Sequence, residues 1–551
     1  METPTDKLSP GADSAVLKIE HVERNLSGVQ LYSANGKHRN IPAPSVDPQD
    51  PLNMRPHRQR LLLAALCIFA ATGFGVIQTT PLFFGNLVQE YMVQSKGTFD
   101  PARIIDLASY TSLCMGMGNF FFVPLSMALG RRATLLTCNA ILLGSMVWAA
   151  RSTSFSSHLG ARCLQGLTAG VADCLLPIMV LDVSFLHQRS KRLVSYWVMT
   201  SAGPSLLLIA IPFMVSSADN NWRVAYYFWT GLVALSLLLI FFFVPETLFL
   251  RQAAQVSGIV HVSDSYGTHR TFASPEEAQA AGFDVCENPS SDNQAEALSD
   301  RVAKPSFASR LALMPVPKDA VVRFSKSYID MATCLVSPGV AWALLLNSFV
   351  FAGIVVLSLT YSQQLELPPW NFSSSTVGTT QAGAALGAAL GLGIGEIAEP
   401  VSRFFTRRNG GTREPEHVLP NFLFPSLVAA LGLIVYGVVA AQPDRYHWVG
   451  VHIAFGLFYF GFCAVSAISG VWLGELLPHK SGPAIVLVCG GRNALSFAYS
   501  HYFSAWKGAI GFMEVYVVFG SILLGLACLS VPLFFVNRRI RRLMSGIKWL
   551  N

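Results

Sequence analysis

The sequence predicts an all-α integral membrane protein with twelve transmembrane helices in two six-helix halves. Of its 551 residues, 52% are hydrophobic and only 13% are charged, whereas a soluble domain carries about 25% charged residues. Twelve apolar runs approach the roughly 20 residues that a helix needs to cross the hydrocarbon core. A long polar stretch separates the first six runs from the last six. These observations favour a membrane-embedded bundle over a soluble or nucleic-acid-binding protein.

The apolar runs define the helices and the regions between them. They cover residues 61–84, 104–128, 133–150, 158–181, 194–215, 224–244, 340–361, 376–397, 420–440, 448–474, 482–504 and 513–536. We expect a disordered cytoplasmic tail at 1–57, an N-terminal half at 58–244, a cytoplasmic central loop at 245–338, a C-terminal half at 339–536 and a basic cytoplasmic tail at 537–551. Residues 311–331 of the central loop mix apolar and basic side chains, which fits an amphipathic surface helix and a plain linker equally well.

The distribution of lysine and arginine predicts the orientation in the membrane. With the N-terminus inside, the cytoplasmic segments hold 31 of the 39 basic residues and the outer loops hold 6, while Arg162 and Arg492 lie within helices. The positive-inside rule therefore places both termini and the central loop in the cytoplasm. The sequon Asn371-Phe372-Ser373 then falls in an outer loop, so we expect N-glycosylation of Asn371.

Two opposite charges lie within the fourth apolar run. An arginine inside a membrane helix costs on the order of 3 kcal/mol, so Arg162, with Gln165 beside it, needs a buried partner or a water-filled cavity. Asp173 follows Arg162 by eleven residues, about three turns, which would put both charges on one face roughly 16 Å apart. This spacing favours a solvated path for substrate or protons. Pairing of each charge with a neighbouring helix is the alternative.

Arg492 and Asn493 form a second polar site, in the eleventh run. Arg492 lies about eleven residues from the inner end, near mid-membrane, so we expect its guanidinium to stay protonated without reaching either surface. A permanent positive charge would favour substrates with a carboxylate or another electron-rich oxygen. It would disfavour cations unless an acid neutralises it, and Asp173 is the only comparably deep acid. A helix clamp to backbone carbonyls is the alternative.

Small residues and helix-end charges predict packing and gating positions. Gly166 and Gly170 lie one turn apart and would let a neighbouring helix approach closely. Gly383, Gly387, Gly391 and Gly395 form a four-residue ladder, which we expect at a moving contact between the halves. Three acids near inner helix ends, predicted as gating or capping groups, are Asp182, Glu396 and Glu475.

Several short motifs resemble the major facilitator superfamily, and in particular its twelve-helix drug:proton antiporter family. The run from Arg162 to Gly166 is similar to the RxxQG motif of helix 4 in these antiporters, and Leu129-Gly130-Arg131-Arg132 resembles the end of the superfamily's helix 2–3 loop motif. Further runs are similar to fungal members, and the resemblance covers roughly residues 47–540. These runs are Asp47-Pro48-Gln49-Asp50-Pro51-Leu52-Asn53, Phe185-Leu186-His187-Gln188-Arg189, Trp222-Arg223, Pro245-Glu246-Thr247-Leu248 and Glu414-Pro415-Glu416-His417.

The sequence departs from the family pattern at two places. Met127 stands where the helix 2–3 motif has an aspartate, which removes one partner of the charge contact that the family builds there. Gly203-Pro204 match the start of the helix 5 antiporter motif, but Leu207-Leu208 replace its second Gly-Pro. The second departure weakens the inference of antiport and leaves the inference of transport unchanged.

The resemblance implies a secondary transporter that works by alternating access, and Asp173 is our candidate for proton coupling. We expect a monomeric carrier that exports a secondary metabolite, drug or organic acid across the plasma membrane, or alternatively the vacuolar membrane. A proton symporter that imports a nutrient or polyamine, and a uniporter or nutrient sensor, are the alternatives. The chain has no GxxxxGK[ST] or HExxH motif. We therefore expect no enzyme activity, metal, redox cofactor or nucleotide, and no nucleic-acid partner.

Overall fold

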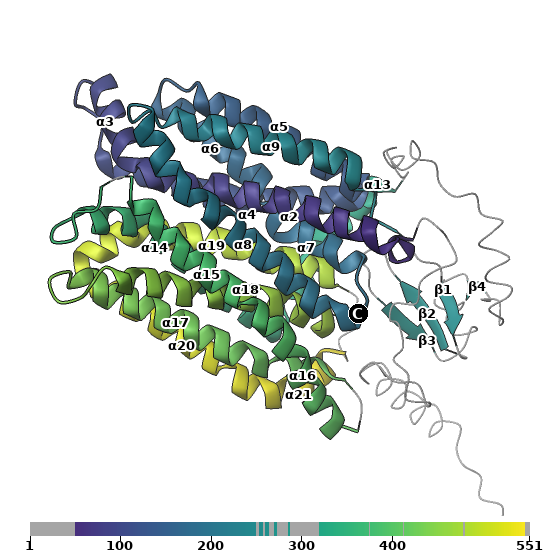
Figure 1. The fold of residues 1–551 in the computed structure, drawn as a ribbon. Helices are drawn as coiled ribbons and strands as arrows, with labels where there is room; N and C mark the ends of the chain where they lie inside the picture. Colours follow the sequence, from purple (N-terminus) through teal and green to yellow (C-terminus); the bar gives the residue numbers. More distant parts are fainter. Residues whose placement is uncertain are drawn as a thin grey trace, which may run out of the picture.

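The structure is a computed structural model in which helices dominate and run along one long axis (Figure 1). It describes residues 50–249 and 319–545, apart from 374, 411–412 and 478–479, together with four short strands between residues 253 and 286. Most of the predicted N-terminal tail, residues 1–49, lies outside the described residues. The first described element is the 3-10 helix η1 (Pro51–Asn53), which begins where the Asp50 carboxylate accepts a hydrogen bond from the Leu52 amide (3.0 Å).

Six membrane-spanning segments form the N-terminal half. Their elements are α2 (Pro56–Thr79), η2 (Thr80–Phe83) and α3 (Phe84–Gln94), then η3 (Pro101–Ile105) and α4 (Asp106–Leu129), α5 (Arg131–Ala150), α6 (Phe155–Ala169) and α7 (Val171–Asp182), α8 (Leu186–Ser217), and α9 (Arg223–Phe243). The fourth segment is interrupted at Gly170, between α6 and α7.

The C-terminal half repeats this plan. Its elements are α14 (Pro338–Glu366), then η4 (Val377–Thr379), α15 (Thr380–Leu390) and α16 (Leu392–Arg408), then η5 (Pro415–Val418) and α17 (Pro420–Ala441), α18 (Val449–Leu476), α19 (Ser481–Ile510), and α20 (Phe512–Cys528) with α21 (Ser530–Ser545). Because α21 continues to Ser545, part of the predicted C-terminal tail is helical.

The predicted all-α membrane bundle is confirmed. Among the described residues, ten segments are long and apolar enough to cross a membrane, and the pair α20 and α21, bent by 42°, makes an eleventh. The helix α19 has 30 residues and is long enough as well. Arg492 and Asn493 in its middle make it less apolar than the others. With α19, the described helices are consistent with the predicted twelve.

The central segment contains strands that the sequence analysis does not predict. The strands β1 (Ala253–Val256), β2 (Ile259–Ser263), β3 (His269–Phe272) and β4 (Val285–Cys286) form a sheet in the order β3-β2-β1-β4. β2 pairs antiparallel with β1 and β3, whereas β4 pairs parallel with β1. Only β2 is rich in the β-branched residues that favour strands. The four strands have two to five residues each, and runs this short are easily hidden in a stretch whose overall composition is polar.

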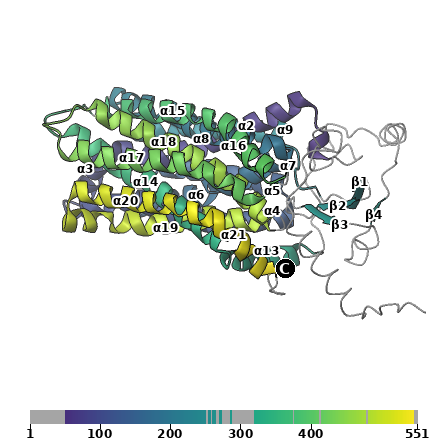
Figure 2. The same ribbon diagram turned by 90° about the horizontal axis from the view of Figure 1, so that it is seen from below.

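A surface helix, α13 (Ala320–Leu335), precedes the C-terminal half. It covers the second part of the predicted amphipathic helix, and residues 311–318 lie outside the described residues. The sheet, α13, α16 and α21 lie at one end of the bundle, which we call the α13 end, and α3 lies at the other (Figures 1 and 2). We call the second the α3 end.

Two seams join the halves. Along the first, α4 packs on α19, and along the second, α8 packs on α15, α16 and α18. At the α13 end of the first seam, α13 packs on both α4 and α19. There the Tyr328 hydroxyl donates to the Phe120 carbonyl (2.9 Å), and the Lys480 ammonium donates to the Thr333 hydroxyl (3.0 Å). The helix therefore bridges the two halves across the end of this seam.

The glycine ladder packs mainly inside the C-terminal half. A Cβ at Gly383 or Gly387 of α15 would clash with a backbone carbonyl of α18. Only the end of the ladder approaches the other half, where Gly395 would place a Cβ 3.2 Å from the Val194 side chain of α8. The prediction of a contact between the halves is therefore wrong for the first two glycines. Spacing alone does not tell which neighbour a small-residue face meets.

We expect Gly387→Ala to lower stability by about 1–3 kcal/mol, because the added methyl forces α15 away from the Gly456 carbonyl. The measurement is the thermal unfolding midpoint of the purified protein in detergent. Gly393→Ala is the matched control, since a Cβ there meets nothing within 4 Å. Equal midpoints for the two variants would show that the close approach of α15 and α18 does not limit stability.

Candidate functional site at the seam between the halves

One buried ion pair joins the two halves. Asp173 lies on α7 in the N-terminal half, and Arg492 and Asn493 lie on α19 in the C-terminal half. The Arg492 guanidinium donates to Asp173 Oδ1 (2.8 Å), and the Asn493 amide donates to Asp173 Oδ2 (2.7 Å). Both carboxylate oxygens are thus held by the opposite half. The side chains of Asp173 and Arg492 are 0% and 1% exposed, so the seam is closed around them.

Three aromatic rings surround the Arg492 guanidinium. Its carbon lies 5.2 Å from the ring centroid of Trp197 on α8, 5.0 Å from that of Phe351 on α14 and 6.0 Å from that of Phe462 on α18. At these distances a ring face attracts a cation. Arg492 also donates to the Ser466 hydroxyl (3.4 Å). The guanidinium therefore keeps favourable neighbours on three helices besides its carboxylate partner.

Two polar atoms of this site are available for a ligand. Within the described part of the chain, Arg492 Nε and Asn493 Oδ1 are buried and have no hydrogen-bond partner. A buried polar atom without a partner is unfavourable, and such atoms often mark a place for water or a bound molecule. The pair therefore leaves one donor and one acceptor beside the aromatic rings.

A further hydrogen bond crosses between the halves. The Tyr459 hydroxyl on α18 donates to Gln78 Oε1 on α2 (2.8 Å). On the C-terminal side, Gln381 of α15 donates to the Tyr361 hydroxyl of α14 (3.3 Å), and Gln381 Oε1 is buried without a partner in the described residues. Polar groups from four helices thus line the middle of the bundle.

Arg162 and Gln165 lie in the N-terminal half and do not contact Asp173. The Arg162 guanidinium donates to the carbonyls of Val76 (2.9 Å), Ile77 (3.0 Å) and Leu107 (3.3 Å), and to Gln165 Oε1 (2.8 Å). These contacts hold α6 against α2 and α4. The two charges predicted on one face therefore serve different neighbours, because the chain breaks at Gly170 between α6 and α7.

The predicted small residues of the N-terminal half contact neighbouring helices. A Cβ at Gly170 would lie 2.5 Å from the Met115 carbonyl oxygen of α4, and one at Gly166 would clash with the Thr111 carbonyl of the same helix. Gly203 approaches Ala71 of α2, and Pro204 lies inside α8. These positions hold the helices of this half together.

The Gly130-Arg131-Arg132 turn closes the α13 end of the N-terminal half. Gly130 has a φ of 96°, a backbone conformation that favours glycine. The next two amides donate to the Glu246 carboxylate at the end of the sixth segment (3.0 and 3.1 Å). Arg131 forms an ion pair with Asp182 at the end of α7. Met127 adds no charge to this turn, and its acidic partners are Asp182 and Glu246.

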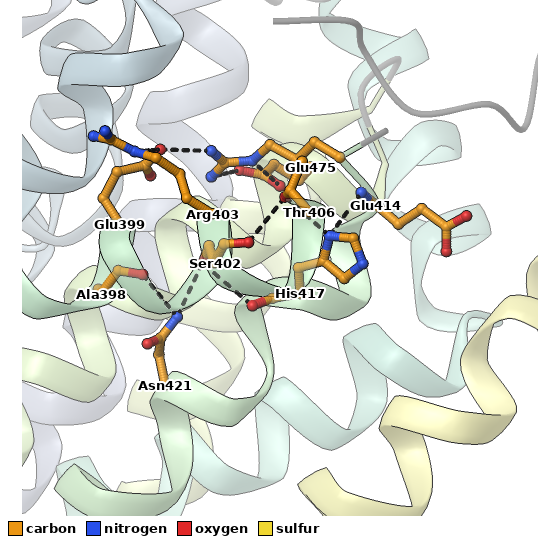
Figure 3. Close-up of polar contacts among 10 residues, drawn as sticks. Ala398, Glu399, Ser402, Arg403, Thr406, Glu414, His417, Asn421 and Glu475 are labelled. Carbon is orange, nitrogen blue, oxygen red and sulfur yellow. Dashed lines mark hydrogen bonds and ion pairs between the residues drawn. The ribbon is translucent and has the colours of Figure 1, made fainter. Parts of the chain in front are cut away.

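The C-terminal half carries a matching network at the same end. Arg413, in the loop after α16, donates to Glu475 Oε1 of α18 (2.7 Å) and to Glu399 Oε1 of α16 (2.9 Å). Burial by itself lowers the pKa of Arg413, but the two carboxylates outweigh burial and hold that pKa above its ordinary value, so it stays charged. Figure 3 shows Glu399 and Glu475 gathered in one cluster with His417.

The contacts between the halves at the two ends of the bundle are weaker. At the α13 end, Lys191 of α8 pairs with Glu396 of α16 (2.5 Å), but both side chains are exposed. Exposed ion pairs contribute about 0–1 kcal/mol. At the α3 end, His501 of α19 lies 4.0 Å from Asp106 of α4, and both side chains are partly exposed. Within the C-terminal half, a cavity of about 490 Å³ opens at the α3 end between α14, α17 and α20, lined by Gln364, Gln442 and Phe512 among others. Neither Asp173 nor Arg492 lines this cavity.

Sequence reasoning misses two groups at these sites. Trp197, Phe351 and Phe462 lie on three different helices, and nothing in their local sequence sets them apart from other membrane aromatics. Arg413 and Glu399 are separated by a loop, so their pairing needs the fold. Glu475 is the exception. Its position near a helix end predicts a gating or capping group, and it belongs to the C-terminal network.

Arg413→Ala should lower stability by about 3–5 kcal/mol, because it leaves two largely buried carboxylates without their cation. The thermal unfolding midpoint in detergent measures the loss. Arg403→Ala is the matched control: Arg403 also pairs with Glu399, but its side chain is 41% exposed, so we expect a loss below about 1 kcal/mol. Similar midpoints for both variants would contradict a stabilising role of the Arg413 network.

Comparison with known proteins places the fold in a family. Residues 61–455 match the Major Facilitator Superfamily. An uncharacterised MFS-type transporter of Schizosaccharomyces pombe is 23% identical over 521 residues, which cover 91% of this chain and 87% of that protein. Protein HOL1 of Saccharomyces cerevisiae is 22% identical over 579 residues, which cover 97% of this chain and 94% of HOL1.

The fold agrees with solved structures of transporters. The proton:xylose symporter XylE from E. coli has a TM-score of 0.53 at 14% sequence identity, with 86% of this chain and 95% of that chain covered. At this identity the likeness concerns the fold alone, and the family match supplies the kind of activity. The chain therefore belongs to the Major Facilitator Superfamily, as a multi-pass membrane protein that is a secondary transporter and not an enzyme.

Proposed function

We propose that the chain is a proton-coupled carrier that exports a small organic molecule, such as a secondary metabolite, a drug or an organic acid. The supporting observation is the buried contact of Asp173 with Arg492 and Asn493. It places a titratable group between the two bodies whose relative movement constitutes alternating access. The direction of transport rests on the resemblance of the Arg162–Gly166 run to the drug:proton antiporter motif.

Protonation of Asp173 would weaken the contact between the halves. The ionised carboxylate accepts two hydrogen bonds and offsets the charge of Arg492. Once it is protonated, the ion pair is lost, and Arg492 keeps only Ser466 and the surrounding rings. A proton that arrives from one side therefore favours separation of the halves. Its release to the other side restores the pair and closes the seam.

The paired state favours a substrate without net charge. Arg492 alone would attract anions, but Asp173 offsets that charge at 2.8 Å. Arg492 Nε and Asn493 Oδ1 offer one donor and one acceptor beside aromatic rings. A neutral molecule with oxygen or nitrogen atoms and an apolar or aromatic body would satisfy both. A charged substrate would have to displace one member of the pair.

We further propose that the α13 end faces the cytoplasm, together with residues 1–57, 245–338 and 537–551. The bias of 31 basic residues against 6 supports this orientation. Asn371 lies exposed in the loop between α14 and η4, and its amide donates to the Pro369 carbonyl (3.3 Å). On the outer side it would be open to N-glycosylation. We expect a monomer in the plasma membrane, with the vacuolar membrane as the alternative, and protons and lipid as its partners besides the substrate.

The test of the function compares cells that lack the gene with cells that carry the wild type or Asp173→Asn. Without the carrier, the exported compound should accumulate inside and disappear from the medium, and the wild type should reverse both changes. Asp173→Asn removes the titratable proton while keeping the shape, so it should reach the membrane but restore nothing. Metabolite profiles of cells and medium, with the amount of carrier in the membrane, supply the measurement.

Glu366→Gln serves as the control, because Glu366 is a carboxylate at the last residue of α14, within the C-terminal half and away from the pair. It should restore export as the wild type does. Restoration by Asp173→Asn to the wild-type level would rule out Asp173 as the coupling group. A compound that is depleted inside cells lacking the carrier would instead indicate import, and the export proposal would fail.

A further inference from the structure

Two cysteines face each other across the seam between the halves. Cys174 follows Asp173 on α7, and its thiol contacts the Ile485 carbonyl of α19 (3.8 Å). Cys489 lies one turn after Ile485 on the same face of α19, so the thiols of Cys174 and Cys489 are neighbours across the seam. Because each thiol comes from a different half, a bond between them would join the halves covalently.

The position of this pair on α19 is fixed by its neighbours. Ile485, Cys489 and Asn493 are spaced by four residues, so they share one face of the helix, and this face meets Cys174 and Asp173. Cys489 lies eight residues after Ser481, where α19 begins, which is about 12 Å from the α13 end. The thiols therefore lie on the α13 side of the Asp173–Arg492 pair.

Cys489 is the more accessible of the two thiols. Arg492 follows by three residues, but Asp173 offsets its charge, so access and not charge decides which thiol reacts first. Cys489 is 7% exposed and Cys174 is fully buried. Cys489 is thus the thiol that a small oxidant reaches first, and Cys174 is in place to react with the product.

We propose that Cys174 and Cys489 form a redox modification site at which a hydroperoxide joins the two halves through a disulfide. The Cys489 sulfur attacks one peroxide oxygen and the O–O bond breaks, which gives a sulfenic acid and one molecule of water when the oxidant is hydrogen peroxide. The Cys174 thiol then attacks the sulfenic sulfur, the S–S bond forms and a second water leaves. Two thiols are oxidised by two electrons, and the peroxide is reduced to water.

The disulfide would hold the carrier closed at the α13 end. Opening to that side requires α7 and α19 to separate near their ends, and a bond about 12 Å from the end of α19 prevents this. A reducing thiol would release the halves. Oxidation at this site would therefore inhibit opening reversibly. This inhibition depends on the movement of the halves and not on proton coupling, so it can be tested separately from the proposed role of Asp173.

A second thiol pair provides a matched control. Cys114 of α4 and Cys163 of α6 are also neighbours, but both lie in the N-terminal half. Oxidation of this pair cannot join the halves. One variant retains only Cys174 and Cys489, the other retains only Cys114 and Cys163, and in each the remaining eight of the ten cysteines are replaced by alanine. Both carry a protease site inserted between β4 and α13.

Purified protein is treated with hydrogen peroxide, cleaved at the inserted site and separated on a gel without reductant. The Cys174/Cys489 variant should run as joined halves that dithiothreitol separates, and the Cys114/Cys163 variant should run as separate halves. Mass spectrometry of the peroxide-treated wild type, which needs no cysteine replacement, should recover the linked peptides containing Cys174 and Cys489. Absence of the link in both the variant and the wild type would overturn the proposal.

Hydrogen exchange then tests whether the disulfide suppresses opening at the α13 end. In the linked carrier, amides at the α13 ends of α7 and α19 should exchange more slowly, by on the order of tenfold, because opening of this end is suppressed. The exchange should return to its original rate after reduction, and peroxide should leave it unchanged in the Cys114/Cys163 variant. A link that forms without slowing this exchange would show that the disulfide does not hold the carrier closed.

Discussion

A buried charge in a membrane protein must be paired, and this constraint organises the carrier around Asp173. Its carboxylate lies fully buried on α7, and both its hydrogen bonds come from α19 of the opposite half. Removing one member of a buried pair costs about 3–5 kcal/mol in soluble proteins. We propose that the halves separate only once Asp173 is protonated, because separation would otherwise leave a buried carboxylate without its partners. Under that proposal, the buried contact between the halves is also the one that a proton abolishes.

The remaining buried charges hold each half together as a unit. At the α13 end, Arg131 pairs with Asp182 inside the N-terminal half, and Arg413 pairs with Glu475 and Glu399 inside the C-terminal half. Contacts between the halves at this end are an exposed ion pair and the surface helix α13. This division fits two rigid bodies that rock about a central seam, since strong contacts lie within each body and weaker ones lie between them at the ends.

The sequence predicts the membrane bundle well, because a long apolar run is stable in lipid as a membrane-spanning helix. It also identifies Asp173, Arg492 and Asn493 as the polar groups of the middle, since each is unfavourable in a membrane helix without a partner. It cannot tell which groups pair. Arg162, predicted on the same face as Asp173, binds carbonyls of its own half instead. The fold is needed to identify partners on other helices, such as the rings around Arg492. The strands of the central segment are likewise visible only in the structure.

The central claim is that ionised Asp173 holds the halves together. Its most direct measurement is the distance between spin labels on exposed sites near the α13 ends of the two halves, at Arg60 and Arg408, recorded by pulsed electron paramagnetic resonance at neutral and acidic pH. The wild type should be closed at neutral pH and gain longer distances on acidification. Asp173→Asn should show the longer distances already at neutral pH. If Asp173→Asn stays as closed as the wild type and responds to acid in the same way, the claim is contradicted.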